Sequence, residues 1–171
     1  LNSKLQAGEF QLSPSMSQVQ IISRLSRGGS FDFWFTVIDG QRVEEFALDQ
    51  DFLTLAKAYE GQFFPDKYLI PKSYSNQQII DLIVGNFQKK YPQLSSENLI
   101  MASIVEREGK SLESKKMIAG ILQNRLQIGM ALQVDATVQY ARDSLSPPQK
   151  YWLPLASSDI TRISSPFNTY Q

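Results

Sequence analysis

The sequence predicts an α+β protein in which a small β-α-β unit precedes a larger domain of mixed helices and strands. Within residues 1–58, short apolar runs with the period of a strand flank an amphipathic helical segment. Residues 76–89 and 99–128 carry the three- and four-residue apolar spacing of helices. The chain has 171 residues, 42% of them hydrophobic, and can therefore bury a core of its own. We expect a first domain over residues 1–58 and a second over residues 59–171.

The composition excludes several kinds of chemistry. The chain contains neither histidine nor cysteine, which rules out disulfides, thiol nucleophiles, His-dependent triads and nearly all zinc sites. Its 17 basic residues balance its 17 acidic residues, so no net field favours nucleic acid. An enzyme made from this chain must use carboxylates, Ser, Lys or Tyr. We expect no metal, no cofactor and no nucleic-acid partner.

The first unit is expected to begin with a strand over residues 8–12. A helix follows, with start signals near Ser17 and an end at Gly28-Gly29. Residues 31–38 form the second strand, and their apolar side chains on both faces predict a strand that is covered on both sides. Patchy helical character fills residues 43–59. This unit is too small to be stable alone and must pack on the domain that follows.

Residues 60–68 form an aromatic stretch that also contains glycine and proline. Two interpretations stay open for it. The simpler one is a loop packed by its own aromatic side chains. The other is a sugar platform, in which aromatic faces stack on carbohydrate rings and acidic side chains bind hydroxyl groups. The amphipathic helix of residues 76–89 follows, and its predicted inner face consists of Ile79, Ile80, Ile83, Val84 and Phe87.

The central helix is expected to begin at Ser95 or Ser96 and to stop at Gly109. Its apolar residues cover nearly the whole circumference, which is typical of a buried helix. The next helix begins at Ser111 or Ser114 and ends before Gly129. The predicted buried face of that helix consists of Met117, Ile118, Ile121, Leu122 and Leu126.

Glu106 lies at the far end of the central helix, beside small residues. A buried carboxylate is costly unless it is paired, hydrogen-bonded or neutralised. Glu106 is therefore either a structural residue paired with Arg107 or Arg125, or the acid of an active site. Glu108 is not its facing partner, because helical residues two apart point to nearly opposite sides. Hydrolytic glycosidases need two carboxyl groups about 5 to 9.5 Å apart, whereas a single group suits a reaction in which it acts first as acid and then as base.

Residues 130–140 begin in extended alternation. This pattern places Gln133, Asp135 and Thr137 in one polar row. Such a row usually faces water, and the alternative is that it faces a groove. Beyond Ala141 the composition is typical of loops.

Several blocks of the sequence together resemble the endolytic murein transglycosylase family. They are residues 102–108 (ASIVERE), residues 124–130 (NRLQIGM) and residues 132–140 (LQVDATVQY). Residues 60–68 (EGQFFPDKY) and residues 168–170 (NTY) match two further blocks. The opening β-α-β unit is similar to the small LysM-like subdomain of that family. The similarity covers essentially the whole chain, in the family's order.

The resemblance implies an enzyme that cuts the glycan strands of peptidoglycan internally, between MurNAc and GlcNAc. It maps the family's glutamate onto Glu106, with Glu108 as the fallback catalyst. In the implied mechanism Glu106 is held neutral by apolar surroundings, protonates the glycosidic oxygen, and then takes a proton from the 6-hydroxyl of the same MurNAc. The products are 1,6-anhydro ends. The expected substrate-binding residues, drawn from the same blocks, are Gln133, Asp135, Thr137, Glu60, Asp66, Tyr68, Asn124 and Tyr140.

Members of this family are usually anchored in the cytoplasmic membrane by an N-terminal helix, which we do not find in this sequence. The resemblance therefore implies a place in the bacterial cell envelope, at the extracytoplasmic face of that membrane. Glycan strands and other cell-wall synthesis proteins are the implied partners. Relatives continue beyond the final NTY block, so we expect the catalytic domain to be incomplete at its C-terminal end.

Two alternatives come from other classes of protein. A non-catalytic peptidoglycan-binding module would use the LysM-like unit and the aromatic stretch, and would bind strands without cutting them. A pyridoxal-phosphate lyase would need a Schiff-base lysine and a phosphate cradle. Lys67 and Lys110 are available, but the sequence shows no cradle, so this alternative ranks last.

Overall fold

The computed structural model describes residue 10, residues 12–26 and residues 32–171. The chain forms two compact units. The first consists of Leu1–Ile38 and Phe46–Lys90, and the second of Asp39–Glu45 and Tyr91–Gln171. The domain division predicted after residue 58 therefore falls inside the first unit.

Helix α1 (Gln18–Ser26) begins where the start signals placed it. The Ser17 hydroxyl accepts a hydrogen bond from the Gln20 N–H at 3.4 Å, which caps the first turn. Apart from Phe10 and Leu12, the predicted strand of residues 8–12 lies outside the described residues, as does the helix end at Gly28-Gly29. The β-α-β arrangement and its LysM-like character therefore stay predictions.

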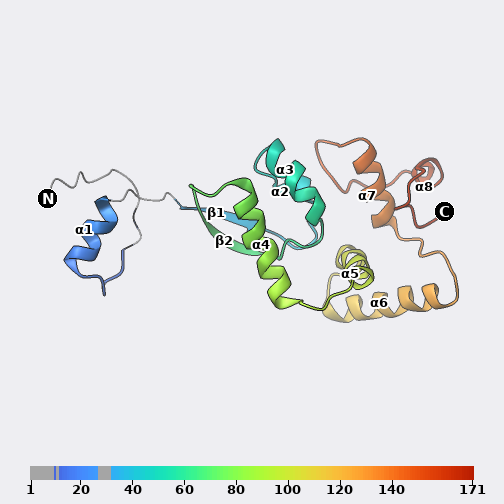
Figure 1. Cartoon of the computed structure of the whole chain (residues 1–171). Coiled ribbons are helices and arrows are strands. Elements are labelled where there is room, and N and C mark those ends of the chain that lie inside the picture. The colour runs from blue at the N-terminus through green and yellow to red at the C-terminus, as the bar shows by residue number, and fades with distance from the viewer. Residues whose placement is uncertain (1–9, 11, 27–31) are drawn as a thin grey trace. The chain divides into compact units, whose positions relative to one another are not determined.

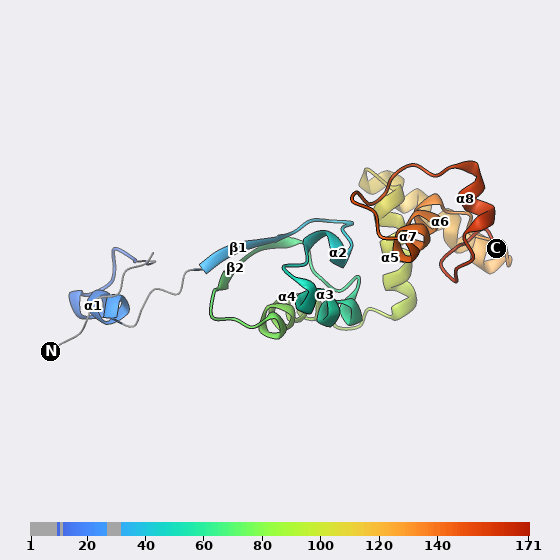
Figure 2. The same cartoon turned by 90° about the horizontal axis from the view of Figure 1, so that it is seen from above.

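The sheet of the first unit has two antiparallel strands, β1 (Asp32–Val37) and β2 (Asp66–Pro71). Phe35 and Val37 are buried on one face of β1, against which α3 (Gln50–Ala56) and α4 (Asn76–Lys90) lie (Figures 1 and 2). On the other face Trp34 is 66% exposed. The prediction that this strand is covered on both sides is wrong, because α3 and α4 pack on one face of the sheet and Trp34 on the other face is exposed.

Aromatic rings and one helix face fill the core of the first unit. Helix α4 buries Ile79, Ile80, Ile83 and Val84, which confirms its predicted inner face. Phe63 packs between Phe46 and Phe52, with ring centroids 5.1 and 6.4 Å away. The aromatic stretch is thus core and strand in large part, with β2 beginning at its end. The short α2 (Val43–Phe46) and the 3₁₀ turn η1 (Lys57–Tyr59) complete the connection between the strands.

The second unit contains the helices α5 (Ser96–Glu108), α6 (Leu112–Gln127), α7 (Asp135–Leu145) and α8 (Ser157–Arg162). Ser95 caps α5 and Ser111 caps α6, as predicted. Gly129 follows α6 with φ +66°, a left-handed conformation that favours glycine. The loop predicted beyond Ala141 is right for residues 146–156 and 163–171 and wrong for the rest, because α7 continues to Leu145 and α8 follows.

The helices of the second unit each bury a narrow stripe. Ile104 is the buried residue of α5, while Ile100 is 61% exposed. Leu122 is the buried residue of α6, while Met117 is 69% exposed. The predictions of a fully buried central helix and of a wide apolar face on α6 are therefore wrong. Ile104 and Leu122 meet Val134 and Ala136 in one cluster, so α5, α6 and the start of α7 share a core.

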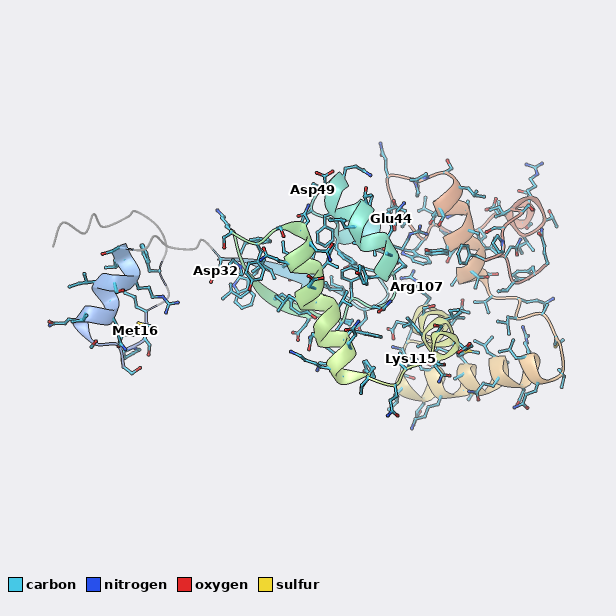
Figure 3. All side chains as sticks on the ribbon, viewed as in Figure 1. Met16, Asp32, Glu44, Asp49, Arg107 and Lys115 are labelled. Atoms are coloured by element: carbon cyan, nitrogen blue, oxygen red, sulfur yellow. The ribbon has the colours of Figure 1, made fainter. Side chains whose placement is uncertain are left out.

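Figure 3 draws the side chains of the described residues as sticks on the ribbon. Among the helices built from described residues, none has the length and apolar character required to span a bilayer.

Candidate active site

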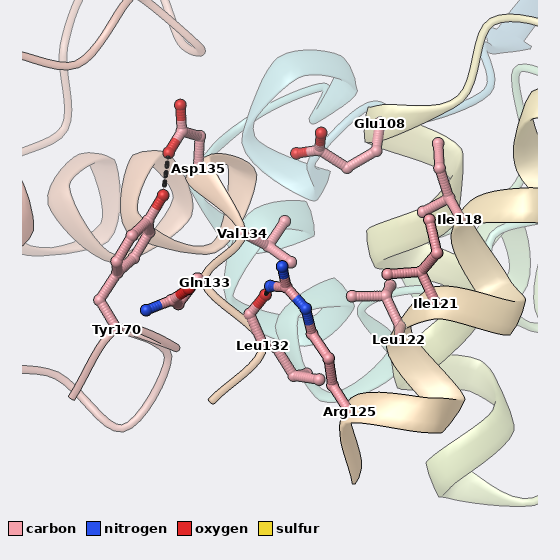
Figure 4. A pocket seen from close by; sticks show the side chains of 10 residues that line it. All are labelled: Glu108, Ile118, Ile121, Leu122, Arg125, Leu132, Gln133, Val134, Asp135 and Tyr170. Carbon is pink, nitrogen blue, oxygen red and sulfur yellow. Dashed lines mark hydrogen bonds between the residues drawn. The ribbon is translucent and has the colours of Figure 1, made fainter. Parts of the chain in front are cut away.

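A pocket of about 320 Å³ opens in the second unit, and we call it the Glu108 pocket. It combines two carboxylates, one guanidinium group, two other polar side chains and an apolar wall (Figure 4). Its lining residues come from α5, α6, the segment before α7, the first residue of α7 and the C-terminal stretch: Glu108, Ile118, Ile121, Leu122, Arg125, Leu132, Gln133, Val134, Asp135 and Tyr170.

Glu108 is the last residue of α5, and its side chain is exposed toward the pocket. Its Oε1 accepts a hydrogen bond from the Ala136 N–H at 3.4 Å. Ala136 belongs to the first turn of α7, where the free N–H groups and the helix dipole favour a negative charge. The N-terminus of α7 therefore orients the Glu108 carboxylate.

Gly109 fixes the turn between α5 and α6. A Cβ atom added here would lie 2.5 Å from Lys115 Cγ and 3.0 Å from Lys115 Cα. Real Cβ atoms do not approach other atoms so closely, so the backbone of α6 packs where a larger residue would stand. This close approach brings the end of α5 beside Ile118 of α6 at the pocket.

Asp135 and Tyr170 form a second polar pair in the pocket. The Tyr170 hydroxyl donates a hydrogen bond to Asp135 Oδ1 at 2.7 Å (Figure 4). This hydrogen bond raises the pKa of Tyr170 above 10.0; burial and the charges of Asp135 and Glu108 act in the same direction, whereas Arg125 lowers it. Two carboxylates and one guanidinium group therefore act on the same hydroxyl.

Arg125 supplies the positive charge of the pocket. It is half-buried, and its Nη1–H donates a hydrogen bond to the carbonyl oxygen of Leu132. This bond ties the end of α6 to the segment that leads into α7.

That segment differs from the prediction. Gln133 has φ +53°, and Asp135 is already the first residue of α7, so the extended polar row is wrong. The Gln133 N–H donates to the Thr169 carbonyl oxygen at 3.0 Å, which holds the backbone in this bend. Gln133 and Asp135 still reach the pocket. Thr137 does not line it, because its hydroxyl donates to the Val134 carbonyl oxygen at 2.6 Å and contacts the Thr169 hydroxyl at 2.9 Å.

Glu106 does not line the Glu108 pocket. Its Oε2 accepts a hydrogen bond from Lys115 Nζ at 2.6 Å, and its side chain is 35% exposed. The expected sheltered, unpaired carboxyl group is therefore wrong. Of the two interpretations of this residue, the ion pair is present, with Lys115 in place of the predicted arginines. Helical geometry explains why Glu108 reaches the pocket and Glu106 does not, since residues two apart point to nearly opposite sides of α5.

Two other expected substrate-binding residues of the second unit lie outside the pocket lining. Asn124 is exposed on α6. Tyr140 is half-buried, with the guanidinium carbon of Arg42 4.1 Å from its ring centroid and the Phe167 ring 5.1 Å away. Tyr140 thus belongs to an aromatic cluster around the buried Arg42.

The remaining expected residues belong to the first unit. Tyr68 is buried, and its hydroxyl donates to the Phe64 carbonyl oxygen at 2.6 Å and accepts from Asn86 Nδ2 at 3.0 Å. Burial raises the pKa of Tyr68, although the Asn86 hydrogen bond lowers it in part. Asp66 is exposed at the start of β2, and Glu60 is half-buried.

Arg125 and Tyr170 were not among the site residues expected from the sequence. Both lie in sequence blocks that resemble the family, residues 124–130 and 168–170, and this resemblance is the signal by which they could have been found. Their convergence depends on Thr169 pairing with residues 133–137, and no local spacing encodes that pairing. Within the described part of the chain, no group of three or more acidic side chains is arranged to hold a metal ion.

Fold and site together define an α+β protein with a carboxylate-bearing pocket at the junction of three helices. Residues 1–171 match the YceG-like family, and the chain belongs to that family. This result confirms the resemblance noted in the sequence.

Curated relatives share this similarity. The chain is 26% identical to the endolytic murein transglycosylase of Streptococcus pneumoniae serotype 2 (strain D39), over 98% of this chain and 40% of the relative. It is also 26% identical to the endolytic murein transglycosylase of Bacillus subtilis strain 168, over 99% of this chain and 58% of the relative. The chain thus spans about half the length of the curated relatives it matches.

A solved structure supports the fold. The crystal structure of a YceG-like protein from Listeria monocytogenes matches with a TM-score of 0.64 at 25% identity, over 98% of this chain and 69% of that one. The predicted α+β class is therefore confirmed.

Proposed function

We propose that the chain is a lytic transglycosylase, that the Glu108 pocket binds a peptidoglycan glycan strand, and that Glu108 is its acid and base. The observation that carries the proposal is the position of Glu108, at the end of α5 in a pocket and hydrogen-bonded to the N-terminus of α7. The names of the curated relatives, endolytic murein transglycosylase, supply the substrate class. The role expected for Glu106 moves to the fallback residue, because Glu106 is paired with Lys115.

The proposed reaction needs one carboxyl group. Protonated Glu108 donates its proton to the glycosidic oxygen, and the bond from that oxygen to C1 of MurNAc breaks as positive charge develops at C1. The carboxylate then accepts the proton of the 6-hydroxyl while the 6-oxygen bonds to C1. The products are a 1,6-anhydroMurNAc end and a free GlcNAc hydroxyl, Glu108 is protonated again, and no water is consumed. The nucleophile belongs to the same sugar, which raises its effective concentration.

Other residues of the pocket would hold the strand. Gln133 and Asp135 are proposed to bind sugar hydroxyl groups, and Tyr170 positions Asp135 through its hydrogen bond. Thr137 supports this arrangement through Thr169 rather than by contact with the substrate. The proposal uses residues of the second unit alone.

The presence of Asp135 makes hydrolysis the competing reaction. A hydrolase would use Glu108 as acid and Asp135 as the group that activates water or attacks C1. The two reactions leave different ends, because hydrolysis gives reducing ends that are one water heavier than anhydro ends.

The test is to incubate purified sacculi with the chain and with a Glu108→Gln variant, and to analyse the released ends by mass spectrometry. We expect anhydro ends from the parent chain and essentially none from the variant. Reducing ends would establish a hydrolase. Strand binding without cleavage by the parent chain would establish the binding module. Cleavage by the variant at the parental rate would remove Glu108 from the mechanism.

A peptidoglycan-cutting enzyme acts in the cell envelope, and we propose the extracytoplasmic face of the cytoplasmic membrane as its place. Other cell-wall synthesis proteins are the proposed partners. Detection of the full-length protein on the outer face of the membrane, by protease accessibility in spheroplasts, tests this location.

A further inference from the structure

We propose that Arg125 recognises a carboxylate of the substrate, so that the Glu108 pocket selects glycan strands whose MurNAc residues carry an acid group. The inference rests on the proposed function, because it takes this pocket to be the glycan-binding site. The role considered for Arg125 from the sequence, that of an ion-pair partner of Glu106, is filled by Lys115 in the structure.

The charges of the pocket lead to this inference. Arg125 is the cation among the lining residues, and Glu108 and Asp135 are the anions. In the part of the chain that the structure describes, no carboxylate oxygen lies within ion-pair distance of Arg125. Its hydrogen bond to Leu132 uses Nη1, so further N–H donors of the guanidinium fork are available to a ligand.

The surroundings of Arg125 favour a strong contact with an acid group. The side chain is half-buried, and its guanidinium group reaches into the pocket beside Leu122, Leu132 and Val134 (Figure 4). Apolar neighbours lower the local dielectric and strengthen a charge-assisted hydrogen bond. The planar fork of a guanidinium group also matches a carboxylate better than an ammonium group does.

The chemistry of the proposed reaction argues against a direct catalytic role for Arg125. Positive charge develops at C1 in the transition state, and an unneutralised guanidinium group nearby would oppose it. A substrate carboxylate bound to Arg125 would remove this repulsion. Without Arg125, the same carboxylate would meet the Asp135 carboxylate and be repelled by it.

Peptidoglycan offers a carboxylate from two sources. The 3-O-lactyl group of MurNAc ends in a carboxyl group, which is free in strands without stem peptides. Where a stem peptide is attached, that group is an amide and the free carboxylates belong to the peptide. The shared chemistry is a carboxylate on the MurNAc side of the cleaved bond.

The experiment measures binding by calorimetry in a Glu108→Gln background, which removes the proposed acid and base. Three probes of equal glycan length are compared: strands without stem peptides, the same strands with their carboxylates converted to amides, and strands that carry stem peptides. With Arg125 present, at least one acid-bearing probe is expected to bind about tenfold or more tightly than the amidated strands. An additional Arg125→Gln change should abolish this preference and leave binding of the amidated strands within about twofold, because an amidated strand offers no negative charge for the guanidinium group to pair with. Arg125→Lys keeps the charge but loses the fork, so it should retain part of the preference.

The outcomes separate the two proposals. Equal binding of acid and amidated strands with Arg125 present overturns the inference and leaves the proposed function standing. An equal loss for all three probes in Arg125→Gln also overturns it, because Arg125 would then only support the segment at Leu132. If no probe binds when Arg125 is present, the proposed function fails together with the inference. A preference for the peptide-free strands identifies the lactyl carboxylate, and a preference for the peptide-bearing strands identifies the stem.

Discussion

The two glutamates at the end of α5 are separated by a single residue, Arg107, and lie in different surroundings. Glu106 meets the first turn of α6, where Lys115 Nζ lies 2.6 Å from its carboxylate. Glu108 meets the first turn of α7, where one N–H lies 3.4 Å away and the pocket is open. One carboxylate is paired within the protein, and the other is available to a ligand. The helix that faces each carboxylate, α6 for Glu106 and α7 for Glu108, therefore decides which of the two is available to a substrate.

The largest effect is expected when each glutamate is exchanged for glutamine, which tests whether Glu106 and Glu108 differ in function. We expect Glu108→Gln to lower the rate of glycan cleavage about 100-fold or more, since general acid–base catalysis contributes roughly 10²–10⁴-fold. Glu106→Gln keeps the shape of its side chain and should leave the rate within about threefold, because its carboxylate does not line the pocket. Release of soluble fragments from labelled sacculi measures both. A larger loss in Glu106→Gln than in Glu108→Gln would reverse the assignment.

A second change, at Gly109, is expected to disturb the surroundings of both Glu106 and Glu108. Gly109→Ala would place a Cβ 2.5 Å from Lys115 Cγ and 3.0 Å from the backbone of the same residue. The turn must shift to relieve this contact, and we expect a loss of about 1 to 3 kcal/mol in the free energy of unfolding. Gly120→Ala in α6 is the matched control, because nothing lies within 4 Å of its added Cβ. The control should be neutral or stabilised by up to about 1 kcal/mol. Urea unfolding measures both, and an unchanged midpoint for Gly109→Ala would show that the turn adapts freely.

A third change tests the pocket side alone. Tyr170→Phe removes the donor to Asp135 and should cost about 1 kcal/mol near neutral pH. The pKa of Tyr170 is raised in the folded state, first by this hydrogen bond. Its contribution is therefore fully present below the unfolded pKa of about 10 and is lost as the pH rises through the higher folded value. The melting temperatures of the parent chain and the variant should approach each other as the pH is raised above about 10. A difference that does not change with pH would exclude the hydrogen bond as its cause.

The smallest effect is expected on the Glu106 side. The Glu106–Lys115 pair is about a third exposed, with side chains 35% and 29% accessible. Exposed pairs contribute roughly 0 to 1 kcal/mol and weaken with salt. A double-mutant cycle of Glu106→Gln and Lys115→Met, measured at low and high salt, should give a coupling in that range. A coupling well above it would show that this pair stabilises the turn as much as Gly109 does.

Local signals predicted much of the fold. Ser95, Ser111 and Gly129 mark helix ends through hydrogen bonds or backbone angles that involve near neighbours in sequence, so the bounds of α5 and α6 were predictable. The start of α7 was not. Residues 132–135 alternate like a strand, but contacts with Thr169 hold Gln133 at a positive φ and start a helix at Asp135.

The candidate site was predictable as a pair of glutamates but not as a choice between them. Helical spacing shows that Glu106 and Glu108 diverge, and it does not show what each one faces. The difference is made by Lys115, which pairs with Glu106 and not with Glu108. Its approach to Glu106 depends on how α6 packs against Gly109. Arg125 and Tyr170 were missed for a similar reason, because the pocket gathers residues from segments that are distant in the chain.

The hydrogen bonds of Thr169 and Tyr170 to the segment around Asp135 also affect the order in which the protein is made. A ribosome releases Glu108 and Asp135 well before these two residues. Until they emerge, the Gln133 N–H and the Asp135 carboxylate lack their partners. The nascent chain therefore completes the Glu108 pocket only after the last of these residues has left the exit tunnel.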